Sequence, residues 1–154
     1  MSERAGSASP AARWFDDVAV GDELGPELRE TSRLQLLAYA SVSRDLNLIH
    51  HDPEVARASG LPATVIQGTL RSAFLARLAT TFAGESGELR RLVVRYRGLD
   101  IPGEPLTARG VVERIDAARG EVECRLWIET ASGDRNTVGS AVVALPRRTP
   151  VPPT

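Results

Sequence analysis

A carboxylate, a carboxamide and an imidazole lie within six residues of one another, at Asp45, Asn47 and His50. An imidazole titrates near neutral pH, and a nearby carboxylate orients it or exchanges a proton with it. Asp45 and His50 are therefore able to divide an acid role and a base role between them. The addition of water across a double bond needs both roles, so this spacing indicates proton-transfer chemistry of that kind.

Each of these residues also has a structural interpretation. A lone loop aspartate commonly ends a helix or forms an Asx turn, and asparagine is a common turn residue. The interval between Asp45 and His50 favours the catalytic interpretation for this pair. Asn47 is more ambiguous on its residue type alone.

The segment Asp45–His50 resembles the motif Asp-x-Asn-Pro-(Ile/Leu/Val)-His of the R-specific enoyl-CoA hydratases, the MaoC-like dehydratases of the hotdog superfamily. The similarity covers roughly residues 14–146. It includes Phe15-Asp16-Asp17-Val18, Val20-Gly21-Asp22, Tyr39-Ala40, Ala56, Gly60-Leu61-Pro62 and Ile66-Gln67-Gly68-Thr69-Leu70. The chain departs from the family at Leu48, where proline is usual, and at Arg44, where glycine is common; without the proline the loop is less rigid.

The resemblance implies catalysis by Asp45 and His50, with R stereochemistry and no cofactor beyond the coenzyme A of the substrate. His50 would activate the water that attacks the β-carbon, and Asp45 would supply or remove the α-proton. Asn47 would orient the site. His51 competes with His50 for the catalytic role, but the motif fixes the interval from the aspartate and His51 directly precedes the helix-capping Asp52. We therefore assign His51 a structural role or one that supports the catalytic pair.

Gln67-Gly68-Thr69 stands at the start of the longest predicted helix. Unpaired backbone N–H groups and the helix dipole favour negative charge there, and glycine allows a ligand to approach closely. We expect the N–H of Gly68 to hold the thioester carbonyl oxygen as it gains charge, with Thr69 as a neighbouring substrate contact. An ordinary helix start would have the same residues, so that alternative stays open.

Hydrophobic periodicity predicts an α+β domain. Helical spacing of Leu34, Leu37, Ala38 and Ser41 predicts a helix over about 33–43, and a longer helix is expected over about 69–83. A strand over 28–31 precedes them, and a short helix follows Asp52-Pro53. Turn residues at 102–103, 118–120 and 132–134 separate four later strands, predicted to form an antiparallel meander. The resemblance implies the specific form: a hotdog fold, whose long central helix is wrapped by a curved antiparallel β-sheet.

The composition fits one domain, which we place at 13–146 between disordered tails at 1–12 and 147–154. A net charge of -1 without a long basic run argues against nucleic acid and against a polybasic membrane anchor. Cys124 is the only cysteine and no apolar leader is seen, so we expect a cytoplasmic protein. One cysteine and two adjacent histidines make a metal site unexpected.

The expected partners are an acyl-CoA thioester and a second hotdog subunit, because dimerisation removes unpaired sheet edges. Both a homodimer and a heterodimer fit the sequence. Two other functions stay open: a non-catalytic subunit of a heteromeric hydratase, and a thioesterase. The thioesterase is disfavoured because many members carry an acidic residue on the long helix, and residues 69–83 contain none. Arg91, Arg95 and Arg97 form a strand face that either meets coenzyme A phosphates or is simply solvated.

Overall fold

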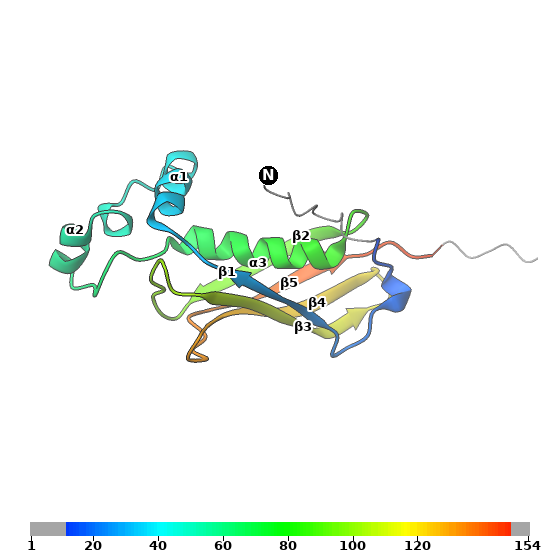
Figure 1. The fold of residues 1–154 in the computed structure, drawn as a ribbon. Coiled ribbons are helices and arrows are strands. Elements are labelled where there is room, and N and C mark those ends of the chain that lie inside the picture. The colour runs from blue at the N-terminus through cyan, green and yellow to red at the C-terminus, as the bar shows by residue number, and fades with distance from the viewer. Residues whose placement is uncertain (1–11, 149–154) are drawn as a thin grey trace, which may run out of the picture.

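A long helix, α3, lies across one face of an antiparallel β-sheet in the computed structural model, which describes residues 12–148 (Figure 1). The elements in chain order are η1 (Phe15–Asp17), β1 (Glu23–Arg29), α1 (Arg33–Ser43), η2 (Leu48–His50), α2 (Pro53–Ala58), α3 (Gly68–Ala83), β2 (Glu88–Tyr96), β3 (Leu106–Asp116), β4 (Glu121–Thr130) and β5 (Thr137–Ala144). This arrangement confirms the predicted α+β class and its hotdog form.

The predicted tails at 1–12 and 147–154 lie almost wholly outside the described residues. Three of their residues, Ala12, Arg147 and Arg148, are described, and the two arginines contact the body of the protein. The guanidinium of Arg147 lies 4.5 Å from the ring centroid of Phe15, and Arg148 forms a 2.6 Å ion pair with Asp17.

The sheet is not the simple meander that the sequence predicts. Its strand order is β1-β3-β4-β5-β2, so β2 pairs with β5 at one edge and β1 pairs with β3 at the other. The segment between β2 and β3 therefore passes the sheet end near the start of α3, where the N–H of Ile66 donates to the carbonyl of Asp100. Alternating hydrophobicity fixes which side chains face the core, but it does not fix which strands are neighbours.

The first strand also begins earlier than predicted, at Glu23 rather than near Leu28. Gly25-Pro26 does not precede the strand but lies within it, where the register with β3 shifts between Leu24 and Glu27. The turn-forming dipeptide thus produces an irregularity in an edge strand, a position where proline is tolerated.

Side-chain caps fix where the two helices beside the motif begin. Ser32 accepts a hydrogen bond from the N–H of Gln35, whose side chain accepts one from the N–H of Ser32, so α1 starts with a capping box. Asp52 accepts from the N–H groups of Glu54 and Val55 and starts α2. The loop that carries the motif lies between the end of α1 and the start of α2.

The core is formed between α3 and the inner face of the sheet. Leu75 and Leu78 of α3 are essentially unexposed, as are Val122, Leu126 and Ile128 of β4. The period-two pattern of β4 therefore predicts its buried face correctly. No helix within residues 12–148 is both long enough and apolar enough to cross a membrane.

Candidate active site

The motif lies on a segment that projects beyond the end of α3. α1, η2 and α2 extend past the sheet at the end where α3 begins, rather than packing over the sheet (Figure 1). We call residues 33–58 the overhang. It is tied to the rest of the domain by Gln67, whose fully buried side chain donates from Nε2 to the carbonyl oxygen of Leu36 at 2.9 Å.

Asp45 follows directly on the end of α1. The chain turns there because Arg44 adopts a left-handed conformation with φ of 58°. The Asp45 side chain is 34% exposed, and its Oδ1 lies 3.5 Å from the backbone nitrogen of Asn47, at the outer limit of a hydrogen bond. Its other oxygen, Oδ2, is directed at His50.

His50 is buried and fixed through one ring nitrogen. Its Nδ1 lies 2.7 Å from the carbonyl oxygen of Val65. A carbonyl accepts only, so Nδ1 carries the proton and, in the neutral ring, Nε2 has the free lone pair. Nε2 lies 3.5 Å from Oδ2 of Asp45, so the structure brings together the two residues expected to transfer protons.

Asn47 occupies the turn between this pair. Its Oδ1 accepts a 3.2 Å hydrogen bond from the N–H of Ile49 and so caps η2, the single turn that ends at His50. The carboxamide oxygen is therefore engaged in holding the loop. The structure gives Asn47 a direct part in positioning His50.

Gly68 is the first residue of α3, and Thr69 beside it is exposed. The preceding residue, Gln67, does not cap the helix with its side chain. A side chain at Gly68 would be crowded, because an added Cβ would lie 3.1 Å from the ring of Tyr96. Val65, whose carbonyl oxygen fixes His50, lies three residues before Gly68 in the loop that leads into α3.

A buried polar network behind the start of α3 was not anticipated from the sequence. Arg71 donates to Asp100 at 2.8 Å, and their side chains are only 5% and 1% exposed. Asn136 donates to the second oxygen of Asp100 at 2.9 Å. The Arg71 guanidinium lies 5.0 Å from the ring centroid of Tyr96, whose hydroxyl is 2.5 Å from that of Ser72.

One feature of the sequence could have predicted this network: Arg71 lies on the face of α3 that packs against the sheet, together with Leu75 and Leu78. Charged side chains are almost never fully buried unless they are paired, so a buried Arg71 requires an acidic partner. Asp100 supplies it from the connection between β2 and β3. The pair holds that connection against the first turn of α3 and, taken together, adds no net charge beside the site.

Other chemistries have little support around this site. Burial raises the pKa of the Cys124 thiol to about 12, and this thiol lies on β4 in the core, so it is not a nucleophile near neutral pH. Within residues 12–148, no three His, Cys, Asp or Glu side chains are grouped so that they could hold a metal ion. Asp45 and His50 are the pair of the overhang that the motif predicts to transfer protons, and their side chains lie 3.5 Å apart.

The hotdog fold and an Asp–His pair beside its long helix define a class of protein, and comparison with known proteins identifies the family. The model of the MaoC-like domain matches residues 16–133, more than half of the chain. The chain therefore belongs to the MaoC-like dehydratase family, as its motif indicated.

Known relatives agree with this assignment. The chain is 30% identical over 146 residues to the fatty acid synthase beta subunit TOXC of Cochliobolus carbonum. The matched region is 92% of this chain but only 7% of that subunit. Among solved structures, the (R)-hydratase of A. caviae involved in PHA biosynthesis superposes with a TM-score of 0.79 at 21% identity, covering 84% of this chain and 98% of that one. The ChsH1-ChsH2 complex of Mycobacterium tuberculosis gives 0.76 at 18% identity, with coverage of 82% and 98%.

Proposed function

We propose that this chain catalyses the reversible hydration of a 2-enoyl thioester to the (R)-3-hydroxyacyl thioester. The proposal rests on the distance of 3.5 Å between Nε2 of His50 and Oδ2 of Asp45. Within residues 12–148, neither atom takes part in another hydrogen bond or ion pair. A water molecule or a substrate carbon held to one side of the pair, within reach of both atoms, would contact a base and an acid together.

In the hydration direction, Nε2 of His50 removes a proton from water while the water oxygen bonds to the β-carbon. The electron pair of the double bond moves toward the carbonyl, and the α-carbon takes a proton from the Asp45 carboxyl. The proton that His50 took from water then passes to the Asp45 carboxylate across the 3.5 Å gap, which restores the starting state of a protonated Asp45 and a neutral His50. The pair thus carries one proton through the cycle, and dehydration follows the same steps in reverse.

Charge that develops on the thioester oxygen needs a stabilising donor. The N–H of Gly68 is the first of α3, where unpaired amides and the helix dipole both favour negative charge. An amide aimed at this oxygen acts more strongly on the enolate-like transition state than on the substrate. Thr69 is exposed beside it and is proposed as a substrate contact.

The reaction adds water without oxidation or reduction, so we propose no cofactor apart from the group that carries the acyl chain. We favour coenzyme A as that group. The motif family named for enoyl-CoA hydratases supports this choice, whereas the resemblance to a fatty acid synthase subunit supports a thioester more generally.

We further propose that a second hotdog subunit completes the acyl site. Four surface hollows of the described residues are lined by neither Asp45 nor His50. The overhang exposes large apolar side chains around the motif. They are Leu34, Leu37, Val42, Leu46 and Leu48. A partner that covers this surface would enclose the pair, and the complex of two named chains among the similar structures makes a different partner chain as reasonable as a second copy.

The partner-subunit alternative has one specific observation in its favour. Exposed Leu46 and Leu48 lie between Asp45 and His50 in the chain, so apolar surface that this chain does not cover adjoins the motif. In that alternative, the purified chain would be inactive and co-expression with a second hotdog chain would restore hydration. The thioesterase alternative has less support, because α3 contains no acidic residue.

The test is hydration of a panel of 2-enoyl-CoA esters of different chain length, followed by loss of absorbance of the conjugated double bond. Replacing Asp45 with Asn or His50 with Gln is expected to lower kcat/KM by about a hundredfold or more, because general acid–base groups contribute on that order. His51→Gln is the matched control and should retain most activity. Near-normal hydration by either the Asp45→Asn or the His50→Gln variant would refute the mechanism.

A further inference from the structure

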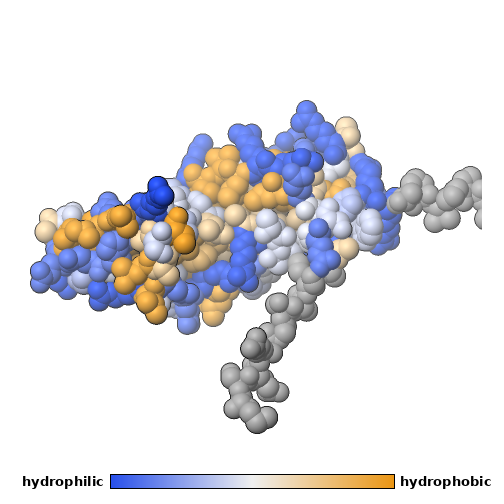
Figure 2. Space-filling model, turned by 90° about the horizontal axis from the view of Figure 1, so that it is seen from above, coloured by the Kyte–Doolittle hydropathy of each residue, from blue (hydrophilic) through white to orange (hydrophobic). Residues whose placement is uncertain are grey.

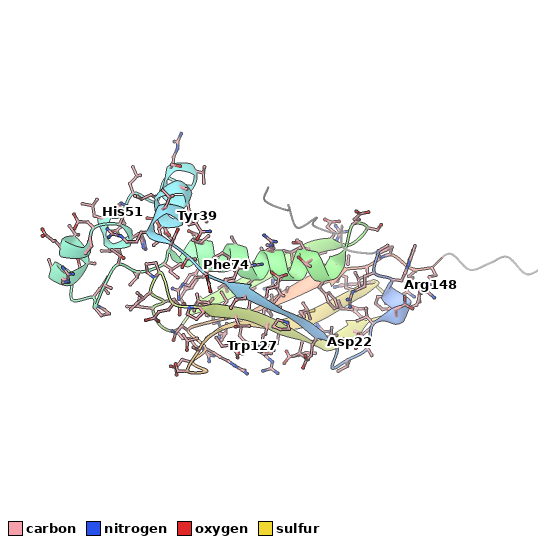
Figure 3. The ribbon with its side chains drawn as sticks, in the orientation of Figure 1. Asp22, Tyr39, His51, Phe74, Trp127 and Arg148 are labelled. Carbon is pink, nitrogen blue, oxygen red and sulfur yellow. The ribbon has the colours of Figure 1, made fainter. Side chains whose placement is uncertain are left out.

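A trough crosses the face of the sheet that points away from α3. Figure 3 shows Trp127 on this outer face, opposite the side where Phe74 of α3 lies. The trough has a volume of about 410 Å³, within the range of small-molecule sites. Its floor is β5, where Val138 and Ser140 are small residues.

The walls of the trough come from the two strands that flank β5. Arg95 of β2 lies across from Val138 on one side, and Trp127 of β4 lies across from it on the other. In the same way, Val93 and Arg125 flank Ser140. Short side chains between long ones produce the hollow, so it follows from the strand register.

The trough is strongly positive although the chain as a whole is not. Four arginines and one glutamate line it, which gives a formal charge of +3 in a chain whose net charge is -1. These residues are Arg95, Arg97, Arg125, Arg135 and Glu113. The nearby Glu129 lies 3.8 Å from Arg135, but it also pairs with Arg109 at 2.8 Å, so including both leaves the balance unchanged.

Two of the four guanidinium groups have no acidic partner within the described residues 12–148. Arg125 pairs with Glu113 at 2.6 Å, whereas neither Arg95 nor Arg97 forms an ion pair with any acidic residue among residues 12–148. Both are exposed and stand two positions apart, Arg95 near the end of β2 and Arg97 directly after it. Unpaired guanidinium groups arranged in this way are suited to bind phosphate oxygens.

An aromatic side chain lies beside these cations. The Arg135 guanidinium lies 4.3 Å from the ring centroid of Trp127, and that of Arg125 lies 5.5 Å away. Stacking on an indole limits the freedom of a guanidinium and directs its N–H groups sideways. With Val93 and Val138 beside it, the indole gives the trough an apolar part that a bare phosphate ion would leave unfilled.

We propose that this trough binds a nucleoside phosphate, with its phosphate groups on Arg95 and Arg97 and its organic part against Trp127 and the floor of β5. Two sources have this chemistry: a free adenine nucleotide, and the adenosine phosphate portion of a coenzyme A thioester. The second source rests on the function proposed above. The site itself does not, because it lies on the opposite face of the sheet from α3.

Binding is measured by the fluorescence of Trp127 in a Trp14→Phe variant, which leaves Trp127 as the only tryptophan of the chain. Adenosine 3′,5′-bisphosphate is expected to change the emission saturably, whereas adenosine and inorganic phosphate should each bind at least tenfold more weakly. Charge-assisted hydrogen bonds are strong enough that Arg95→Ala and Arg97→Ala should each weaken binding by about tenfold.

Arg91→Ala is the matched control. Arg91 is an exposed arginine of β2, as Arg95 is, but it lines a different hollow, so its removal changes the net charge equally and leaves the trough intact. Unchanged affinity in Arg91→Ala supports the site. Equal loss in all three arginine variants, no saturable response, or a response to polyglutamate but not to the nucleotide would overturn it. Circular dichroism confirms that each variant is folded.

The two sources are separated by kinetics. If the trough receives the nucleotide of the substrate, adenosine 3′,5′-bisphosphate will raise KM for a 2-enoyl-CoA but not for the matching enoyl-pantetheine thioester. If it receives a free nucleotide, the two thioesters will respond alike. Either result supports the trough as a nucleoside phosphate site, and an inactive enzyme that still binds the nucleotide would count against the hydratase proposal alone.

Discussion

At the scale of single residues, the site depends on how the two nitrogens of His50 are used. Nδ1 is committed to the backbone carbonyl of Val65, a partner that no side-chain substitution removes. The tautomer is therefore set by the fold, and Nε2 is left toward Asp45. What side-chain chemistry does control is the turn that carries His50, through the cap supplied by Asn47.

We expect Asn47→Ala to lower kcat by about tenfold with little change in KM, because loss of a cap costs about 1 kcal/mol and loosens the approach of His50 to Asp45. Steady-state kinetics with the best enoyl thioester checks this. Asn47→Ser keeps an oxygen that is able to cap the turn and should recover most of the rate. If serine rescues nothing, the carboxamide has a role other than capping.

The departure at Leu48 is explained at the same scale. Asn47 has φ of -63° and ψ of 121°, an extended conformation that a following proline requires. Leu48 is the first residue of η2, a position where proline fits. The backbone of this loop would therefore accept a proline at position 48.

At the scale of elements, the end of α1 determines where Asp45 lies. Arg44 takes the left-handed conformation there, with φ of 58° and ψ of 22°. Such a conformation costs an L-residue about 1 kcal/mol or more, and glycine adopts it readily. The glycine that is common at this position in the family is thus explained by the backbone, and the arginine of this chain is a strained replacement.

Arg44→Gly is expected to raise the free energy of unfolding by about 1 kcal/mol and Tm by about 2–4 °C, because it removes the left-handed penalty. Thermal unfolding followed by circular dichroism measures both. The neighbouring Ser43→Gly is the matched control: Ser43 ends α1 in the helical conformation, so glycine there should lower stability. A destabilised Arg44→Gly would show that the Arg44 side chain contributes more than its backbone costs.

Another element-scale feature is the first turn of α3. The buried pair of Arg71 and Asp100 fastens the connection between β2 and β3 to the helix, while Gln67 fastens α1 to it. Three segments far apart in the sequence therefore meet at the helix start where Gly68 presents its N–H. In the proposed mechanism, these contacts would hold the Gly68 N–H in place as a donor to the thioester oxygen.

At the scale of the whole molecule, the overhang presents an apolar surface that the described chain does not cover. Leu34 is 75% exposed and Leu37 49%, whereas Leu36 and Ala40 face inward. Figure 2 shows apolar side chains gathered on this end of the molecule when it is viewed from above. Contiguous exposed apolar surface of this kind marks an interface, which agrees with the proposal of a second hotdog subunit.

We expect the purified chain to be at least a dimer by light scattering after gel filtration, and Leu34→Glu with Leu37→Glu to shift it toward the monomer, because a charge at a buried contact is costly. Hydration should fall with the loss of assembly. The control is Val20→Glu, an equally exposed apolar position (62%) outside the overhang. Unchanged oligomeric state and activity in the double variant would place the interface elsewhere.

Much of this protein could be predicted from its sequence because the decisive signals are local. Ser32 and Asp52 start helices where they were expected to, α1 spans 33–43 as predicted, and Gly103, Gly120 and Gly133 take positive φ at the predicted turns. A cap, a turn or a periodic face depends on residues a few positions apart, so a short stretch of chain contains the whole interaction.

The remaining features involve residues far apart in the chain, and only the tertiary structure decided them. The pairing of β2 with β5, the burial of Arg71 against Asp100 and the trough between Arg95 and Trp127 all join segments at least 29 positions apart. The helical spacing of Leu34 and Leu37 predicted α1 but not that this face points outward. Periodicity shows that a face is apolar, whereas only packing decides whether the chain itself or another protein covers it.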